Sequence, residues 1–289
     1  MSRSPALPDE TRPGRTALSV ADRAAMIEFY RDIVGLRVRN RDETRATLGT
    51  GETPLLELLE DPSTEQRGER ETGLYHNAFR VPSREALGSA LARIRDRWSL
   101  EGASDHGVSE ALYCTDPEGN GVEIYRDRPR DAWPRTEDGS IRAAGGPLDL
   151  ADLAAAADDG TGSNGPQLVP DGTTLGHVHL EVSSLEAARS FYAETLGFDV
   201  SMSFAPGACF FAAGGYHHHI GVNTWGERST PADGLGLEWF ELLVPDADAI
   251  DAIRERLIDD GVSVTADDDG DGIECTDPDG ITIRLRATD

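Results

Sequence analysis

Apolar and polar residues alternate between positions 176 and 182, which predicts a β-strand buried on one face. The apolar face carries Val178, Leu180 and Val182. The polar face carries His177, His179 and Glu181. Two histidines and a carboxylate therefore share one side of the predicted strand.

A helix is predicted directly after this strand. Ser183 and Glu186 have the spacing of a capping box, and Gly197 can end the helix near Leu196 in a left-handed conformation. Apolar residues keep helical periodicity at Leu185, Ala188, Phe191, Tyr192 and Leu196. The Phe191-Tyr192 pair is therefore expected in the core. Strand patterns follow at 208–213 and 217–224.

The same order of strand, helix and short strands occurs four times, in repeats of about 50 residues. The first and third repeats align through Phe29-Tyr30 and Phe191-Tyr192. The second and fourth align through Thr115-Asp116-Pro117 and Thr276-Asp277-Pro278. Repeats of this length usually bury a shared core by packing on their neighbours. The sequence predicts an α+β fold of four βαβββ units in two tandem domains.

Only the middle two repeats carry metal-binding types of side chain at aligned positions. The three candidate ligands are His76, Glu123 and His177. Their counterparts in the outer repeats are, in the same order, Trp239, Arg284 and Arg15. His218 likewise aligns with Leu56. Function is expected to reside in the middle repeats alone.

The chain has 289 residues, a length that fits two ordinary domains. We expect a disordered tail over 1–12, an N-terminal domain over 13–127, a linker over 128–172 and a C-terminal domain over 173–289. The linker is rich in Pro, Gly, Asp and Ala, with one or two helical turns expected at 149–157.

The formal net charge is -26, and the basic side chains are arginine and histidine because the chain has no lysine. Nucleic-acid binding is not expected, since contacts to phosphates need a basic surface. The run Asp267-Asp268-Asp269-Gly270-Asp271 could be a calcium loop or a solvated acidic surface, and we favour the solvated surface. High net charge favours solubility and is used by halophiles, so we expect a salt-adapted protein.

No apolar stretch is long enough to span a bilayer, and residues 1–12 lack the apolar core of a signal peptide. Cys114, Cys209 and Cys275 are widely spaced and form no CxxC pattern, so neither a disulfide framework nor a zinc ribbon is expected. The simplest location is the reducing cytoplasm.

Several motifs carry a family resemblance. They are the opening strand Gly176-His177-Val178-His179-Leu180, the helical Phe191-Tyr192 pair and the closing run from Asp116-Pro117 to Glu123. With these motifs the chain resembles the vicinal oxygen chelate superfamily, which includes glyoxalases, fosfomycin-modifying enzymes, bleomycin-binding proteins and extradiol dioxygenases. The four-repeat length, with Gly73-Leu74-Tyr75-His76 and Gly215-Tyr216-His217-His218-His219, looks like catechol-2,3-dioxygenase-type ring-cleavage enzymes.

The resemblance implies a metal centre built from His177, His76 and Glu123. Two imidazoles and one carboxylate suit non-haem Fe(II) and leave positions for substrate and dioxygen, and Mn(II) accepts the same ligands. Each residue alone could be an ordinary core histidine or a surface carboxylate. Together they coincide with the family pattern, while the sister repeats carry other residues. His179 shares a face with His177 and could replace it as ligand.

The resemblance also implies two catalytic residues. Tyr113 stands ten residues before Glu123, as in extradiol enzymes, and would hydrogen-bond a substrate oxygen. His218 would act as acid or base, because imidazole exchanges protons near neutral pH. His219 is its rival, since neighbouring strand residues point to opposite faces. His106 either lines the pocket or is a buried structural histidine.

The implied reaction is cleavage of a small aromatic diol by dioxygen beside its two hydroxyls, giving a semialdehyde. One alternative is a glyoxalase-like metal-dependent isomerase or thiol transferase, which gains ground if His218 or His219 is a fourth ligand. Another is a metal-free ligand-binding protein of the same fold, which does not need the three candidate ligands in register.

The ligand set departs from the common two-domain extradiol enzymes, which draw all three ligands from the C-terminal domain. Here the second repeat would combine with the third. Either the repeats pair across the domain boundary within one chain, or the site is completed between subunits of a homo-oligomer. The sequence leaves open the ring substituents of the substrate, the native metal and the oligomeric state.

Overall fold

The structure is a computed structural model that describes residues 6–142, 145–157, 168–204, 206–267 and 270–288. Its contacts divide the chain into two compact units, each with residues from both halves of the sequence. Unit 1 comprises Met1–Ala17, Glu65–Tyr75 and His177–Asp289, and unit 2 comprises Leu18–Thr64 and His76–Gly176. No helix in the described part of the chain is both long and apolar enough to cross a membrane.

The first two repeats contain eight strands and the connecting helices. The strands are β1 (Arg12–Val20), β2 (Arg37–Arg41), β3 (Arg45–Thr50), β4 (Thr53–Glu60), β5 (Gly73–Arg80), β6 (Gly102–Asp105), β7 (Ser109–Thr115) and β8 (Gly121–Asp127). The helices are α1 (Arg23–Phe29), the π-helix η1 (Tyr30–Val34) and α2 (Arg84–Arg97). The segment after β8 adds the 3-10 helix η2 (Arg130–Ala132) and α3 (Leu150–Ala155).

The third and fourth repeats have the same plan. Their strands are β9 (Thr174–Glu181), β10 (Asp199–Phe204), β11 (Ala208–Ala212), β12 (Ile220–Asn223), β13 (Gly236–Val244), β14 (Thr265–Ala266), β15 (Gly272–Thr276) and β16 (Thr282–Ala287). Their helices are α4 (Leu185–Arg189), the π-helix η3 (Ser190–Thr195) and α5 (Ala247–Asp259).

The strands form two eight-stranded sheets, with the orders β14-β15-β16-β13-β1-β4-β3-β2 and β10-β11-β12-β9-β5-β8-β7-β6. Parallel pairing joins the first and last strands of a repeat, as in β5 with β8, β9 with β12, and β13 with β16. The strands between them pair antiparallel, as in β7 with β8. A parallel pair needs a crossover connection, which the helix provides. The α+β fold of βαβββ repeats is thereby confirmed.

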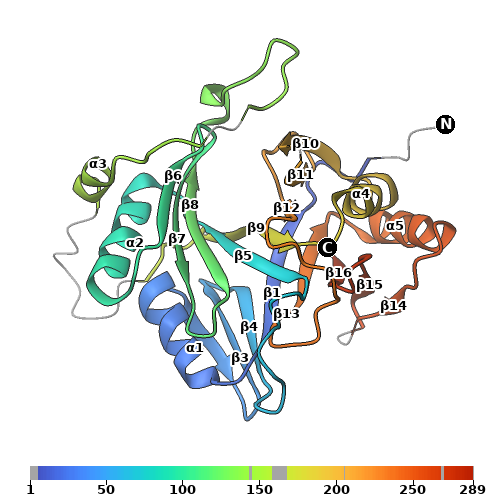
Figure 1. The fold of residues 1–289 in the computed structure, drawn as a ribbon, viewed down its shortest axis with the longest axis horizontal. Helices are drawn as coiled ribbons and strands as arrows, with labels where there is room; N and C mark the ends of the chain where they lie inside the picture. Colours follow the sequence, from blue (N-terminus) through green and yellow to red (C-terminus); the bar gives the residue numbers. More distant parts are fainter. Residues whose placement is uncertain (1–5, 143–144, 158–167, 205, 268–269, 289) are drawn as a thin grey trace. The chain divides into compact units, whose positions relative to one another are not determined.

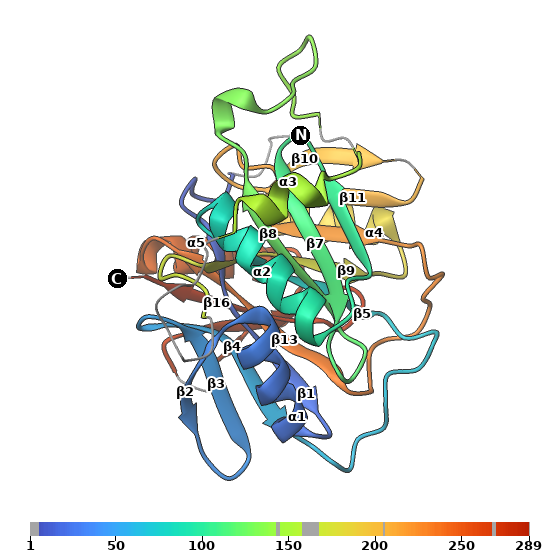
Figure 2. The same cartoon turned by 90° about the vertical axis from the view of Figure 1, so that its left-hand side faces the viewer.

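Helix α2 shows how one face of a sheet becomes core. Its buried apolar residues are Ala86, Leu87, Ala90, Leu91 and Ile94, which lie at helical spacing on one side. This side packs against the β6–β8 strands, and α3 lies next to α2 (Figure 1 and Figure 2). Full burial of a leucine or isoleucine side chain contributes about 1.5–3 kcal/mol. Ser83 begins the helix by accepting a hydrogen bond from the Ala86 N–H at 3.2 Å.

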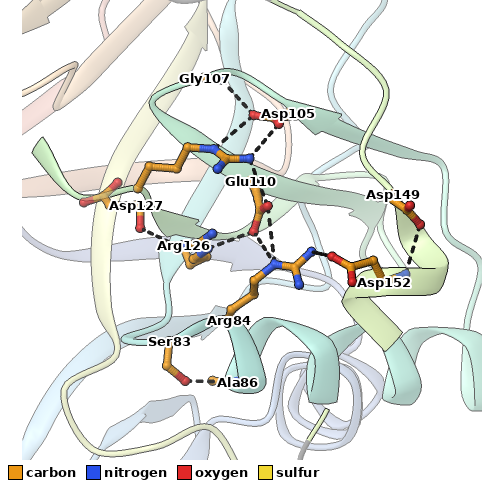
Figure 3. Close-up of polar contacts among 11 residues, drawn as sticks. Ser83, Arg84, Ala86, Asp105, Gly107, Glu110, Arg126, Asp127, Asp149 and Asp152 are labelled. Carbon is orange, nitrogen blue, oxygen red and sulfur yellow. Dashed lines mark hydrogen bonds and ion pairs between the residues drawn. The ribbon is translucent and has the colours of Figure 1, made fainter. Parts of the chain in front are cut away.

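A buried carboxylate joins these elements. Glu110 on β7 accepts hydrogen bonds from the Nε atoms of Arg84 at 3.1 Å and Arg126 at 2.8 Å (Figure 3). It also accepts one from Nη2 of Arg128 at 3.1 Å. Arg84 also forms an ion pair with Asp152 of α3 at 2.9 Å. Removal of Glu110 would leave clustered guanidinium groups without their shared partner, a strongly destabilising change for a buried network. The network therefore ties α2, β7, β8 and α3 together.

The helix of the third repeat begins one residue later than the capping-box spacing predicts. Ser184 is the cap, and its Oγ accepts from the Ala187 N–H at 3.2 Å. The N–H of Ser183 instead donates to Asp279 Oδ2 at 3.0 Å. A partner from the fourth repeat therefore decides which serine caps the helix.

The end of this helix matches the expectation. The helical turns reach Thr195, and Gly197 follows with a φ of 95°. The strand expected at 217–224 is shorter, because regular pairing begins only at Ile220. The turns expected at 149–157 correspond to α3, which Asp149 caps.

Two expectations fall partly outside the described residues. Of the tail expected at 1–12, residues 1–5 lie outside, whereas Leu7 is buried and its N–H donates to the Gly197 carbonyl at 2.9 Å. In the acidic run, Asp268 and Asp269 lie outside, and Asp267 is buried and forms an ion pair with Arg286 at 3.1 Å.

The repeats share details of their cores. The rings of Phe29 and Tyr30, and those of Phe191 and Tyr192, both lie 5.1 Å apart at 88°, and all four are buried as expected. The Tyr30 hydroxyl donates to Asp116 Oδ2 at 3.0 Å. The Tyr192 hydroxyl donates to Asp277 Oδ2 at 2.9 Å. Each odd-numbered repeat is therefore bonded to the next by the same tyrosine–aspartate pair.

This pair predicts a pH dependence of stability. Burial raises the pKa of Asp277 from 3.8 to about 6, so the folded chain holds this proton at pH values where the unfolded chain has lost it. The stability that the raised pKa of Asp277 contributes is fully present below the unfolded pKa of 3.8. It is lost as pH rises through the folded pKa of about 6. Relative to Asp277→Asn, the parent's free energy of unfolding should fall by on the order of 2–3 kcal/mol between pH 4 and 6.

Urea unfolding at several pH values would measure this difference, with Asp259→Asn on the exposed side of α5 as control. A difference between parent and Asp277→Asn that is constant, or that grows in the parent's favour with pH, would contradict the assignment.

Candidate metal centre

His76 and Glu123 meet because of the register between β5 and β8. The parallel pairing sets His76 opposite Gly121 and Ala78 opposite Glu123, so the histidine and the glutamate point to the same face. His76 Nε2 lies 3.1 Å from Glu123 Oε2. Both residues are buried. The two side chains thus form a buried polar contact on this face of the sheet.

Tyr113 completes this face of unit 2. It is directly opposite Glu123 across the β7–β8 pair, and its ring centroid lies 5.8 Å from that of His76. His106 Nε2 lies 2.8 Å from the Tyr113 hydroxyl oxygen. His106, which sequence reasoning left without a defined role, therefore orients the hydroxyl of Tyr113.

A second histidine cluster lies in unit 1. The rings of His177 and His218 are 4.1 Å apart, and His177 is buried. His218 Nδ1 lies 2.8 Å from His217 Nδ1, so one of these two nitrogens carries a proton. His218 is half-buried, whereas its neighbour His217 is fully buried.

The two rival histidines make other contacts. His219 Nδ1 accepts from the Ala213 N–H at 3.2 Å, and its ring stacks on Tyr216 at 4.8 Å. His179 Nε2 lies 3.1 Å from the Asn223 side-chain nitrogen. A Cβ on Gly221 would come within 3.0 Å of His179 Cγ, so the glycine leaves room for this ring.

Among the described residues, one group of side chains could hold a metal ion: His76, Glu123 and His177. Their ligand atoms all lie within 4.8 Å of one another, and all three residues are buried. Two ligand atoms held about 2.1 Å from one ion at a right angle are about 3 Å apart, which agrees with the 3.1 Å between His76 and Glu123. The donor set therefore fits a divalent transition metal.

Gly176 precedes His177, and its backbone is packed tightly within unit 2. A Cβ at this position would lie 1.9 Å from the Tyr125 hydroxyl oxygen and 3.0 Å from Arg80 Cβ. Tyr125 is itself packed with Ala78 and Ala111 in a buried cluster. Because one peptide bond joins Gly176 to His177, the tyrosine fixes where the His177 backbone begins.

The outer repeats show what replaces the ligands. Trp239 and Arg284 occupy the positions of His76 and Glu123, and the Arg284 guanidinium lies 4.3 Å from the Trp239 ring centroid. Arg15, the counterpart of His177, lies 5.3 Å from the same ring. Cation–π contacts thus occupy the position equivalent to the metal group.

The comparisons with known proteins identify the family. A family model of the Glyoxalase/Bleomycin resistance protein/Dioxygenase superfamily matches residues 12–124 and 174–285. This chain belongs to that superfamily, as its resemblance implied. It is 37% identical over 262 residues to the catechol-2,3-dioxygenase of Bacillus subtilis (strain 168), covering 89% of this chain and 90% of that protein.

Other known proteins have a lower sequence identity to this chain. Biphenyl-2,3-diol 1,2-dioxygenase 3 of Rhodococcus globerulus is 31% identical over 107 residues, which cover 36% of this chain and 56% of that protein. A crystal structure of a candidate dioxygenase from Bacillus subtilis subsp. subtilis str. 168 has a TM-score of 0.66 at 13% identity and covers 98% of this chain and 86% of that chain. Glyoxalase I from Zea mays has a TM-score of 0.56 at 17% identity, covering 96% and 92%. The two structural likenesses show the fold.

The packing at Gly176 predicts an effect on metal binding. Gly176→Ala should lower Mn(II) affinity by about 10–100-fold, the range typical of residues that orient a ligand. Tyr125→Leu removes the hydroxyl oxygen and the ring carbon that an added Cβ at position 176 would meet, so the double variant should recover part of the lost affinity.

Competition with a metal chelator would give the affinities, and circular dichroism would show that each variant is folded. Gly146→Ala is the matched control, since its Cβ would lie an ordinary 3.5 Å from the Asp105 carbonyl oxygen. Parent-like affinity in Gly176→Ala, or no recovery in a folded double variant, would contradict the positioning.

Proposed function

We propose that this chain is an extradiol ring-cleavage dioxygenase that acts on a catecholic diol with non-haem Fe(II) and dioxygen. The observation that carries the proposal is the buried group of His76, Glu123 and His177. The 37% identity to a catechol-2,3-dioxygenase across most of both chains supports the same reaction.

The metal would be held by two neutral imidazoles, from His76 and His177, and by the carboxylate of Glu123. Such a set is typical of Fe(II) oxygenases, and Mn(II) accepts the same donors. When bound, the metal would favour the ionised diol and supply a path for electrons between diol and dioxygen. Burial of all three residues keeps bulk water from the donor atoms.

Tyr113 would hold one oxygen of the diol. Its ring lies beside His76, and its hydroxyl lies 2.8 Å from His106 Nε2. When the imidazole nitrogen accepts the tyrosine proton, the hydroxyl oxygen keeps its lone pairs for a hydroxyl of the substrate. When it donates, the hydroxyl proton can point to a substrate oxygen. In both tautomers His106 fixes the direction of the Tyr113 hydroxyl.

His218 would act as the acid or base of the reaction. It lies beside His177, it is half-buried, and its Nδ1 is held by His217 at 2.8 Å, which orients the ring. An imidazole with one nitrogen held in this way can exchange a proton at Nε2. The backbone contact of His219 Nδ1 favours His218 for this role.

We also propose that the enzyme acts in the cytoplasm. Cys114, Cys209 and Cys275 are all free and buried, a pattern that suits a reducing compartment.

The test of the function is a single-turnover assay. The protein is loaded with Fe(II) without oxygen in concentrated potassium chloride, which screens its acidic surface, and is then given catechol and labelled dioxygen. We expect a yellow semialdehyde that carries both labelled oxygen atoms, with equimolar oxygen uptake. Absence of oxygen uptake while Fe(II) stays bound would overturn the proposal.

The ligand variants make this test specific. His76→Ala, Glu123→Gln and His177→Ala should each lose bound Fe(II) and ring cleavage together. Glu274→Gln in the fourth repeat, where the side chain pairs with Arg284 at 2.9 Å, should keep both.

His218 predicts a separate effect on turnover. His218→Asn should lower kcat by about 10²–10⁴-fold, the usual contribution of a positioned acid or base, while metal affinity stays near that of the parent. His219→Gln should instead lower thermal stability, because the Ala213 N–H loses its acceptor. The assignment is wrong if His219→Gln loses kcat and His218→Asn does not.

A further inference from the structure

The hydroxyl of Tyr113 is contacted by His106, which begins the turn between β6 and β7. The His106 N–H donates to the Ser109 carbonyl oxygen at 2.8 Å, which closes this turn. Gly107 has a φ of 74°, a left-handed backbone that favours glycine. The imidazole of His106 therefore projects from a tight turn, and the groups that hold the turn also hold the ring.

Two carboxylates stand at the base of this turn. Asp105 of β6 is directly opposite Glu110 of β7 in the strand pairing. Glu110 is buried, and Asp105 is half-buried. Like charges directly opposite each other in a sheet are destabilising. The two carboxylates would therefore push the ends of the turn apart if no cation joined them.

Arg128, which follows β8, is the cation that joins them. Its Nη2 donates to Asp105 Oδ2 at 2.7 Å and to Glu110 Oε1 at 3.1 Å, and its Nε donates to Asp105 Oδ1 at 3.3 Å. Asp105 Oδ1 also accepts from the Gly107 N–H at 2.9 Å (Figure 3). A planar guanidinium suits this bidentate contact, whereas an ammonium is a point charge. Arg128 thus ties both strands to the turn, next to His106.

The segment after β8 holds Arg128 in its place. The Arg128 N–H donates to the Val108 carbonyl oxygen at 2.8 Å, and the Arg128 carbonyl oxygen accepts from the Trp133 indole N–H at 2.8 Å. The Trp133 side chain is buried. A Cβ on Gly107 would lie 2.9 Å from Pro134 Cγ. This segment therefore packs directly on the turn.

The backbone of Asp105 has a further partner in Gly146. The two residues exchange backbone hydrogen bonds of 2.9 and 3.0 Å, and the Ser104 hydroxyl donates to the Gly146 carbonyl oxygen at 3.3 Å. β6 is the last strand of its sheet, so Gly146 satisfies backbone groups that an edge strand would leave open. Asp105 is thus held through its backbone as well as through its carboxylate.

We propose that Arg128 and Asp105 are positioning residues for the reaction, acting through the turn that carries His106. The inference rests on the proposed function, in which Tyr113 holds one oxygen of the diol. Without Arg128, the repulsion between Asp105 and Glu110 widens the turn. The His106 imidazole then leaves its place beside the Tyr113 hydroxyl, and the hydroxyl no longer has a fixed direction.

The test is a double-variant cycle on kcat/KM for catechol, measured with the Fe(II)-loaded enzyme. Arg128→Gln should lower kcat/KM by about 10-fold, within the roughly 10²-fold that a displacement of about 1 Å can cost. In a His106→Gln background the same change should lower kcat/KM by less than about twofold, because the ring through which Arg128 acts is already absent.

Arg84→Gln is the matched control. Arg84 pairs with the same Glu110 at 3.1 Å, but from the first turn of α2. Its loss should lower the thermal stability as Arg128→Gln does, while kcat/KM stays near that of the parent. A merely structural role for Arg128 predicts the same loss of kcat/KM with and without His106, and that result would overturn the inference.

Asp105→Asn is a second variant, which decides the inference if Arg128→Gln does not fold. The amide oxygen of asparagine still accepts from the Gly107 N–H, whereas its NH2 group cannot accept from Arg128. Asp105→Asn should lower kcat/KM by about fivefold in the presence of His106 and by less than about twofold in the His106→Gln background. Parent-like kcat/KM in Asp105→Asn would also overturn the inference.

Failure of the proposed function has a different signature, since the Fe(II)-loaded parent would then cleave no diol. Nitrogen-15 NMR of the His106 imidazole, assigned by its loss in His106→Gln, decides the positioning in the metal-free protein. The parent and Arg84→Gln should show one tautomer, because the hydrogen bond at Nε2 fixes the proton. Arg128→Gln should show a mixture of two tautomers. An unchanged imidazole spectrum in folded Arg128→Gln would overturn the inference.

Discussion

The parallel pairing between the first and last strands of a repeat is the constraint on which the rest of the structure depends. In the second repeat it sets His76 and Glu123 on one face, with their ligand atoms 3.1 Å apart. In the fourth repeat the same pairing brings Trp239 within 4.3 Å of Arg284. The backbone therefore brings the two positions together whatever side chains they carry, and the side chains decide whether the place can bind a metal.

The middle repeats carry side chains that can bind a metal at these positions, and the outer repeats carry a tryptophan and two arginines. Metal ligands are polar groups that are costly to bury without a partner. In the outer repeats, Trp239 makes cation–π contacts with two arginines, and each arginine also pairs with a glutamate. The outer repeats thus keep the fold without the three candidate metal ligands. The tyrosine–aspartate pairs of Tyr30 with Asp116 and Tyr192 with Asp277 are retained in both halves, since they join the repeats rather than serve the site.

Local pattern explains what could be predicted from the sequence. Alternation of apolar and polar residues predicted the strand that carries His177. Comparison of the repeats singled out His76 and Glu123 as candidate ligands. Both signals follow from a fixed backbone period. Contacts between distant segments could not be read in this way. The Ser183 N–H donates a hydrogen bond to Asp279, and the helix cap therefore lies one residue later than the sequence pattern predicts. The packing of Tyr125 on Gly176 likewise has no signal in the local sequence. His106 beside Tyr113 required the register of the β6–β7 hairpin.

X-ray absorption at the iron edge of the Fe(II)-loaded protein would show whether the middle repeats hold one metal through two histidines and a glutamate. We expect a spectrum fitted by two imidazole ligands with the remaining positions filled by oxygen, and by one imidazole in His177→Ala if iron is retained. A spectrum with three or four imidazoles, or one unchanged by loss of His76 or His177, would contradict it.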